Sequence, residues 1–280
     1  MLYHSHCRRL RRIPMFKLYF IYLLLAHVLG DYYFQNERLA EEKINSLYKQ
    51  GIHGSIYTVT GIVCILPVFQ IKLLIAVLVL SISHFLIDLA KFYYMTLMDK
   101  APLPPQVQRS LYLADQALHI VCIFAASFFL TISGVELEPL PIIWKFFEVI
   151  EVWPFAVLSW VTMLLLMWKP ANITIKQLLC LYKPSEENSC FLEVPSETEQ
   201  DRKEVEESSK KIGGFIGFLE RLILLILLSI NQYSAMGLVL TAKSIARYNK
   251  IIENKEFAEY YLLGTLLSTV MVIGAYLIIF

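Results

Sequence analysis

The chain has little of what marks a secreted, soluble or nucleic-acid-binding protein. Its five cysteines show no CxxC or other metal-ligand spacing, so neither a disulfide framework nor a thiolate zinc site is expected. The formal net charge is only +1, and Lys and Arg do not gather on one face, which argues against a nucleic-acid partner. Charged residues make up 18% of the 280 positions, whereas 57% are hydrophobic, a composition too apolar for a soluble globule.

Long apolar runs dominate the chain instead. Hydropathy predicts seven transmembrane helices, at residues 16–34, 52–69, 73–94, 111–132, 152–168, 213–240 and 258–280. The expected fold is an all-α, polytopic transmembrane helical bundle in a cell membrane. Pro67 lies in a short connector, which predicts a tight hairpin of the second and third helices. The connectors after helices one, three and five carry more Lys and Arg than the others, which places them in the cytoplasm.

Hydropathy also divides the chain into four parts. They are a four-helix block at 16–133, a connector with the fifth helix at 134–168, a charged linker at 169–212 and a terminal two-helix block at 213–280. The linker has too little apolar surface to build a core, so we expect it to be mobile or a solvated helix. No small-residue cleavage pattern follows the basic residues before Pro14, which predicts a retained first span.

Pairs of an acid and an imidazole, four residues apart, interrupt three of the apolar runs. They are His27 with Asp31, His84 with Asp88, and Asp115 with His119. An ionised Asp in hydrocarbon costs about 2.5 kcal/mol or more, so its repeated occurrence needs a reason. Residues four apart in an α-helix differ by about 40° in direction, so each pair points one way. The fifth run, 152–168, has no ionisable residue at all.

The positions of the pairs within their helices predict that they meet. Asp31 and Asp88 fall near the ends of the first and third helices. His53 and Asp115 fall near the starts of the second and fourth. These four places lie on the same side of an up-and-down bundle. We therefore expect seven side chains to converge at the cytoplasmic ends of these helices: His27, Asp31, His53, His84, Asp88, Asp115 and His119.

Imidazole nitrogen and carboxylate oxygen are ligands of zinc, manganese and iron, so this set predicts a divalent-metal site. The four histidines would be nitrogen ligands, and the three aspartates would bridge metals or act as the base that activates water. Seven donors exceed one tetrahedral site, which leaves open two metal ions or one ion with outer carboxylates that orient its ligands. Lys91 lies about 20° from the face of His84 and would sit near a substrate anion.

The same residues resemble a known family. They resemble the bacterial family catalogued as domain of unknown function 3307. The strings that carry the resemblance are His27-x3-Asp31-Tyr-Tyr-Phe-Gln35, then Lys43 and His53 with Tyr57, then His84-x2-Ile-Asp88-x2-Lys91, and then Asp115-Gln116-x2-His119. The resemblance covers residues 23–121, and the strings GFLERL, AKSIAR and EYYLLGTLLS extend it over most of the chain apart from the linker. The family has no assigned activity. Its pattern is similar to that of bacterial membrane-bound metal-dependent hydrolases, an analogy that does not itself carry a reaction.

Three functions are compatible with these observations. The first is metal-dependent hydrolysis of an ester or phosphoester in an amphiphilic, lipid-like small molecule, with membrane lipid as the natural partner. The second is a proton- or ion-coupled transporter, although a relay needs polar groups that continue to the opposite face, and here they gather at one end. The third is a non-catalytic membrane scaffold whose charged linker recruits a cytosolic partner.

Overall fold

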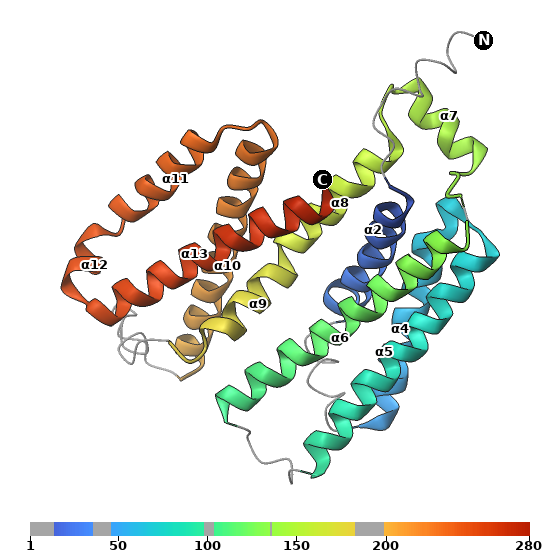
Figure 1. Cartoon of the computed structure of the whole chain (residues 1–280). Helices are drawn as coiled ribbons and strands as arrows, with labels where there is room; N and C mark the ends of the chain where they lie inside the picture. The colour runs from blue at the N-terminus through green and yellow to red at the C-terminus, as the bar shows by residue number, and fades with distance from the viewer. Residues whose placement is uncertain (1–13, 36–45, 98–103, 135, 183–198) are drawn as a thin grey trace. The chain divides into compact units, whose positions relative to one another are not determined.

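The computed structural model describes residues 14–35, 46–97, 104–134, 136–182 and 199–280 (Figure 1). Most of these residues are helical, and none of them forms a strand. Seven helices are long and apolar enough to cross a membrane, which confirms the predicted all-α polytopic fold. The chain divides into two compact units, Met1–Thr162 and Met163–Phe280, and each is described by itself.

Four helices form a bundle in the first unit (Figure 1). They are α2 (Met15–Val28), α4 (Leu47–Ile65), α5 (Ile71–Leu97) and α6 (Pro105–Ile132). Each packs against the next in the chain, and α6 closes the ring against α2. The first part of α8 (Pro154–Met167) covers α2, where the rings of Tyr22 and Phe155 meet at 6.5 Å. As a result, α2 is buried on nearly all sides from Leu18 to Val28.

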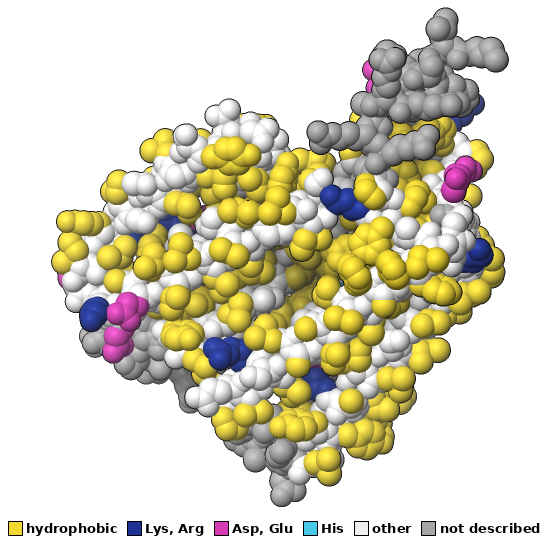
Figure 2. Space-filling view, in the orientation of Figure 1, with side chains coloured by type: hydrophobic (Ala, Val, Ile, Leu, Met, Phe, Trp, Pro, Cys, Tyr) yellow, Lys and Arg dark blue, Asp and Glu magenta, His cyan; other side chains and the backbone are white. Residues whose placement is uncertain are grey.

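The bundle buries polar side chains and exposes apolar ones. Along α5 the buried residues recur every three or four positions and include His84 and Asp88. The opposite face of α5 exposes large apolar side chains such as Ile75, Ile82 and Leu86. Figure 2 shows hydrophobic side chains over most of the visible surface. This pattern reverses that of a soluble protein and is the one expected where the outer faces of helices meet lipid.

α4 and α5 form the predicted tight hairpin. A single 3-10 turn, η3 (Leu66–Val68), contains Pro67 and lies between them. Near this turn Gly61 of α4 faces Val77 of α5 so closely that an added Cβ would lie 2.7 Å from Val77 Cγ1. The backbone N–H of Leu140 donates to the carbonyl of Pro67 at 2.8 Å, which ties the turn to the start of α7 (Pro141–Val149).

The second unit contains α9 (Lys169–Leu179), α10 (Glu199–Ser229), α11 (Tyr233–Ile245), α12 (Tyr248–Glu253) and α13 (Lys255–Ile279). The helix breaks between α8 and α9 at Trp168, whose ψ is −97°. Arg221 of α10 is buried and donates from Nε to the carbonyl of Met167 at 2.8 Å and from Nη2 to Asn172 Oδ1 at 2.5 Å. The guanidinium thus bonds a carbonyl at the break, where the helix ladder is interrupted.

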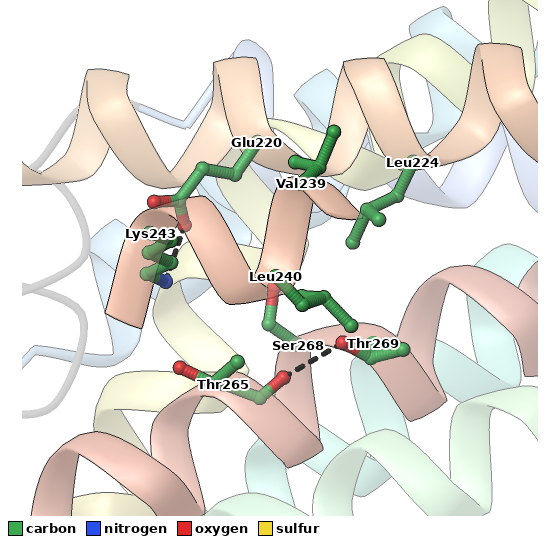
Figure 3. A pocket seen from close by; sticks show the side chains of 8 residues that line it. All are labelled: Glu220, Leu224, Val239, Leu240, Lys243, Thr265, Ser268 and Thr269. Carbon is green, nitrogen blue, oxygen red and sulfur yellow. Dashed lines mark hydrogen bonds and ion pairs between the residues drawn. The ribbon is translucent and has the colours of Figure 1, made fainter. Parts of the chain in front are cut away.

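A second polar contact in this unit joins α10 to α11. Lys243 Nζ lies 2.5 Å from Glu220 Oε2, and the pair lines a small pocket with Leu224, Thr265 and neighbouring side chains (Figure 3). Lys243 also lies over the ring of Tyr261, 5.4 Å from its centroid. The two opposite charges therefore offset each other within the unit.

The sixth membrane span is shorter than the sequence indicated. Residues 213–240 were expected to form one helix, but α10 ends at Ser229 and α11 begins at Tyr233. Asn231 lies between them with a φ of 59°, a left-handed conformation that Asn adopts more readily than most residues. Because the apolar run continues past this turn, hydropathy alone gave no sign of it. The predicted linker, 169–212, contains α9 and the start of α10, and its residues 183–198 lie outside the described residues.

Candidate metal centre

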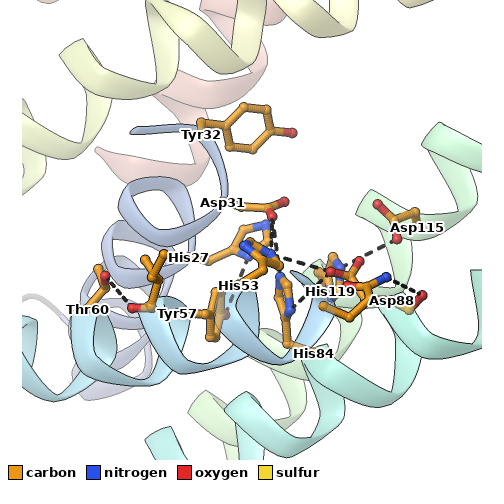
Figure 4. A network of polar contacts seen from close by, with 12 residues as sticks. His27, Asp31, Tyr32, His53, Tyr57, Thr60, His84, Asp88, Asp115 and His119 are labelled. Carbon is orange, nitrogen blue, oxygen red and sulfur yellow. Dashed lines mark hydrogen bonds and ion pairs between the residues drawn. The ribbon is translucent and has the colours of Figure 1, made fainter. Parts of the chain in front are cut away.

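The seven side chains predicted to converge do lie together in the first unit (Figure 4). They are His27 of α2, Asp31 of the π-helical turn η2 (Leu29–Tyr33), His53 of α4, His84 and Asp88 of α5, and Asp115 and His119 of α6. This cluster holds four of the six histidines in the protein. Six of its seven residues are buried, and the Asp31 side chain is only 10% exposed.

The cluster lies deeper in the bundle than the predicted helix ends. The structure extends α5 to Leu97 and begins α6 at Pro105, beyond the predicted limits at 94 and 111. At about 1.5 Å per residue, Asp88 is about 13 Å from the end of α5, and Asp115 is about 15 Å from the start of α6. The prediction ended both helices where hydropathy falls, but helical hydrogen bonding continues into the more polar turns.

Two imidazoles contact carboxylates that come from different helices. His53 Nε2 lies 3.2 Å from Asp31 Oδ1 and 3.4 Å from Asp88 Oδ2. His84 Nε2 lies 3.5 Å from Asp31 Oδ1, and His84 Nδ1 lies 3.9 Å from Asp88 Oδ2. These are ion-pair distances, yet the ring nitrogens of both histidines miss hydrogen-bond geometry with every described group. The nitrogens therefore approach the acids without being satisfied by them.

The aromatic rings of the cluster hold one another in place. His84 stacks on Tyr57 with a centroid distance of 3.9 Å, and on His119 at 4.2 Å with an interplanar angle of 8°. His27 approaches the same stack, with its ring 5.2 Å from that of His119. Because these rings limit one another's rotation, their nitrogens keep fixed directions.

Several buried nitrogen and oxygen atoms of the cluster, each able to bind a metal ion, have no hydrogen-bond partner within the part of the chain that the structure describes. They are Nε2 of His27 and His119, both ring nitrogens of His53 and His84, and Oδ1 of Asp115. Buried polar atoms in proteins are nearly always bonded, and an unbonded one costs about 1–3 kcal/mol. So many buried polar atoms without hydrogen bonds in one place are typical of a ligand-binding site.

Three overlapping sets of residues could each hold a metal ion. The sets are His27 with Asp31 and His84, His53 with His84 and Asp88, and Asp88 with Asp115 and His119. In each set, one donor atom from every residue lies within 4.8 Å of the other two. Donors that bind one zinc ion at about 2.0–2.2 Å are separated by about 3.3–3.6 Å, so small side-chain movements would complete a site. The residues present therefore fit a divalent metal ion.

Gln116 connects two of the carboxylates. Its Nε2 donates to Asp31 Oδ2 at 3.3 Å and to Asp115 Oδ2 at 3.2 Å. Its Oε1 accepts from the hydroxyl of Tyr32 at 2.7 Å, and that hydroxyl lies 3.1 Å from the hydroxyl of Tyr112. The amide therefore fixes one oxygen of each acid and leaves the other directed toward the imidazoles, as outer groups do in metal sites. The sequence reasoning did not assign this role to Gln116.

The π-helical turn positions the α2 side of the cluster. The N–H of Phe34 donates to the carbonyl of Leu29 at 2.9 Å, five residues back, in a turn type that is frequent at functional sites. Gly30 lets this turn approach α4, because an added Cβ would lie 2.8 Å from the Tyr57 ring. The Tyr57 hydroxyl lies 3.5 Å from His27 Nδ1, which leaves Nε2 as the free nitrogen of that ring.

Lys91 lies beside the cluster and is 29% exposed. Its Nζ is 3.3 Å from Asp115 Oδ2. The cluster therefore holds three carboxylates, and Lys91 is a cation beside one of them. Buried carboxylates are costly in a membrane interior, and a divalent cation bound among them would offset that cost.

The polar groups of α4, α5 and α6 do not continue from the cluster to the opposite end of the bundle. Toward that end, the side chains buried on these three helices are mainly apolar, as in Ile65, Leu73 and Val77. Hydroxyls such as those of Ser81 and Ser127 donate to carbonyls of their own helices. The described side chains of these three helices therefore form no continuous polar path toward that end.

These features define a helical membrane protein with a buried His and Asp cluster. Residues 19–142 match the family model described as "Protein of unknown function (DUF3307)". That part of the chain belongs to this family, and it contains all seven cluster residues and nearly all of the four-helix bundle. The comparisons with curated proteins and with solved structures found no match.

Proposed function

We propose that the cluster binds a divalent metal ion, either zinc, manganese or iron, and that the protein is a membrane-embedded metal-dependent hydrolase. The observation that carries this proposal is the meeting of seven ligand-type side chains, among which six of the eight histidine ring nitrogens are buried without a hydrogen bond. The ligands would be drawn from His27, Asp31, His53, His84, Asp88, Asp115 and His119.

A divalent ion held there would supply Lewis acidity and favour deprotonation of water near neutral pH. The protein's own groups would position and move the protons. Asp115 suits the role of ligand or of base, because its Oδ1 faces the cluster without a bond while Oδ2 is held by Lys91 and Gln116. Asp31 and Asp88 are the alternatives, each within 3.4 Å of His53 Nε2.

The surroundings of the cluster favour an amphiphilic substrate with an ester or phosphoester bond. The helices that carry it expose apolar faces suited to lipid, so a lipid-like molecule could reach the site without leaving the membrane. Lys91 is the partly exposed cation beside the cluster and would contact an anionic group of that substrate. A phospholipid of the cell membrane has both properties.

Metal analysis of detergent-purified protein tests the first step. We expect at least one equivalent of zinc, manganese or iron per chain, lost in the double variant His84→Ala with His119→Ala. The matched control is Ser81→Ala with Ser127→Ala, since these buried residues lie on the same faces of α5 and α6. Wild-type protein that is folded and free of metal after growth and purification with these metals present would end the proposal.

Hydrolysis is tested with phospholipid and neutral ester lipid in mixed micelles. We expect product release that stops after chelation, returns when metal is restored, and is lost in Asp115→Asn. Metal-loaded protein that cleaves neither substrate would leave metal binding standing and remove the hydrolase assignment for these two bond types.

A further inference from the structure

We infer that the cluster holds two divalent metal ions in adjacent triads. This inference rests on the proposed metal binding and deepens it. Of the three candidate sets, two share no residue, and together they use six of the seven side chains. The first triad is His27, Asp31 and His84, and the second triad is Asp88, Asp115 and His119.

Each triad brings its own unbonded donors. In the first triad, His27 Nε2 and both nitrogens of His84 lack hydrogen bonds. In the second triad, His119 Nε2 and Asp115 Oδ1 lack them and lie 3.7 Å apart. A single ion in either triad would leave the donors of the other buried and unbonded, at about 1–3 kcal/mol for each.

The two triads adjoin each other. His84 of the first stacks on His119 of the second at 4.2 Å. His53, the seventh residue, places Nε2 between Asp31 Oδ1 and Asp88 Oδ2, one carboxylate of each triad. Gln116 also donates to one carboxylate of each. Two-metal hydrolytic sites hold their ions about 3.5–4 Å apart, which requires that the residues around the two ions contact one another, as the two triads do.

Charge identifies the class of ligand that would accompany the second ion. Two divalent ions bring four positive charges to three carboxylates, one of which also faces Lys91, so the occupied site has excess positive charge. An anion must then balance the site, and a phosphate group does so. Binding of the second ion and of phosphate should therefore strengthen each other, since coupling between two ligands is reciprocal. This favours a phosphoester over a neutral ester as substrate.

Manganese titration of the purified full-length chain tests the inference, because manganese reports by its spin as well as by its amount. We expect two ions per chain, an electron paramagnetic resonance spectrum of exchange-coupled ions, and tighter binding of the second ion with inorganic phosphate. His27→Ala and His119→Ala should each retain one uncoupled ion. Ser127→Ala, a buried residue of the same helix as His119, should retain two.

One ion in wild type, or two ions without exchange coupling, would overturn the inference and leave the proposed metal binding intact. Absence of any bound manganese, zinc or iron would overturn both. Where an alanine variant does not fold, His27→Gln and His119→Gln replace it, and the wild-type stoichiometry and spectrum decide without a variant.

Discussion

Replacing Gln116 by Leu tests how the carboxylates of the cluster are positioned. The amide donates to Asp31 Oδ2 at 3.3 Å and to Asp115 Oδ2 at 3.2 Å, and Leu can make neither bond. A hydrogen bond to a charged group contributes about 1.5–3 kcal/mol, and the length of these two favours the low end. Loss of such an outer group typically weakens metal binding about 10–100-fold, equivalent to about 1.4–2.8 kcal/mol.

The assay is competition for zinc between the purified protein and a chelating indicator of known affinity. We expect the zinc affinity of Gln116→Leu to fall about 10–100-fold. Gln106→Leu makes the same chemical change at an exposed position of α6 and should bind zinc as wild type does. A folded Gln116→Leu protein with wild-type affinity, or an equal loss in Gln106→Leu, would refute the idea that this amide positions metal ligands.

Three further predictions address packing and charge. Gly61→Ala should lower the free energy of unfolding by about 1–3 kcal/mol in detergent melts, because the new methyl group would lie 2.7 Å from Val77 Cγ1 of α5. Gly51→Ala is the control: its methyl group has open space, so the free energy of unfolding should rise by up to about 1 kcal/mol. Arg221→Met should lower it by about 1–3 kcal/mol, because the buried carbonyl of Met167 and the half-buried Asn172 Oδ1 lose their donor; an unchanged melting temperature would contradict this. Lys91→Met should tighten zinc binding about tenfold in the indicator assay, because the positive charge beside Asp115 that repels the metal ion is removed; weaker binding would contradict this.

The convergence of the ligand-type residues could be predicted because it follows from two regular features. Residues four apart share a helix face, and alternating helices bring an end and a start to the same side of a bundle. His53 shows how far this reasoning reaches, since its position in α4 alone placed it with the pairs, and its Nε2 lies 3.2 Å from Asp31.

Groups that act across irregular backbone could not be predicted in this way. Gln116 and Tyr32 each follow a predicted ligand by one residue, which in a regular helix directs them about 100° away. Tyr32 reaches Gln116 from the π-helical turn, and no sequence signal marked that turn. Arg221 likewise lies in an apolar run, and its partner is a carbonyl beside a helix break at Trp168 that no sequence signal marked.

The apolar layer contributed by α4, α5 and α6 has a consequence for experiments in vesicles. Because this layer lies between the cluster and one end of the bundle, a hydrated metal ion would enter and leave from the other end. A chelator that cannot cross a bilayer would then strip only those molecules whose entrance faces it. The metal that survives such treatment would report the direction in which each molecule is inserted.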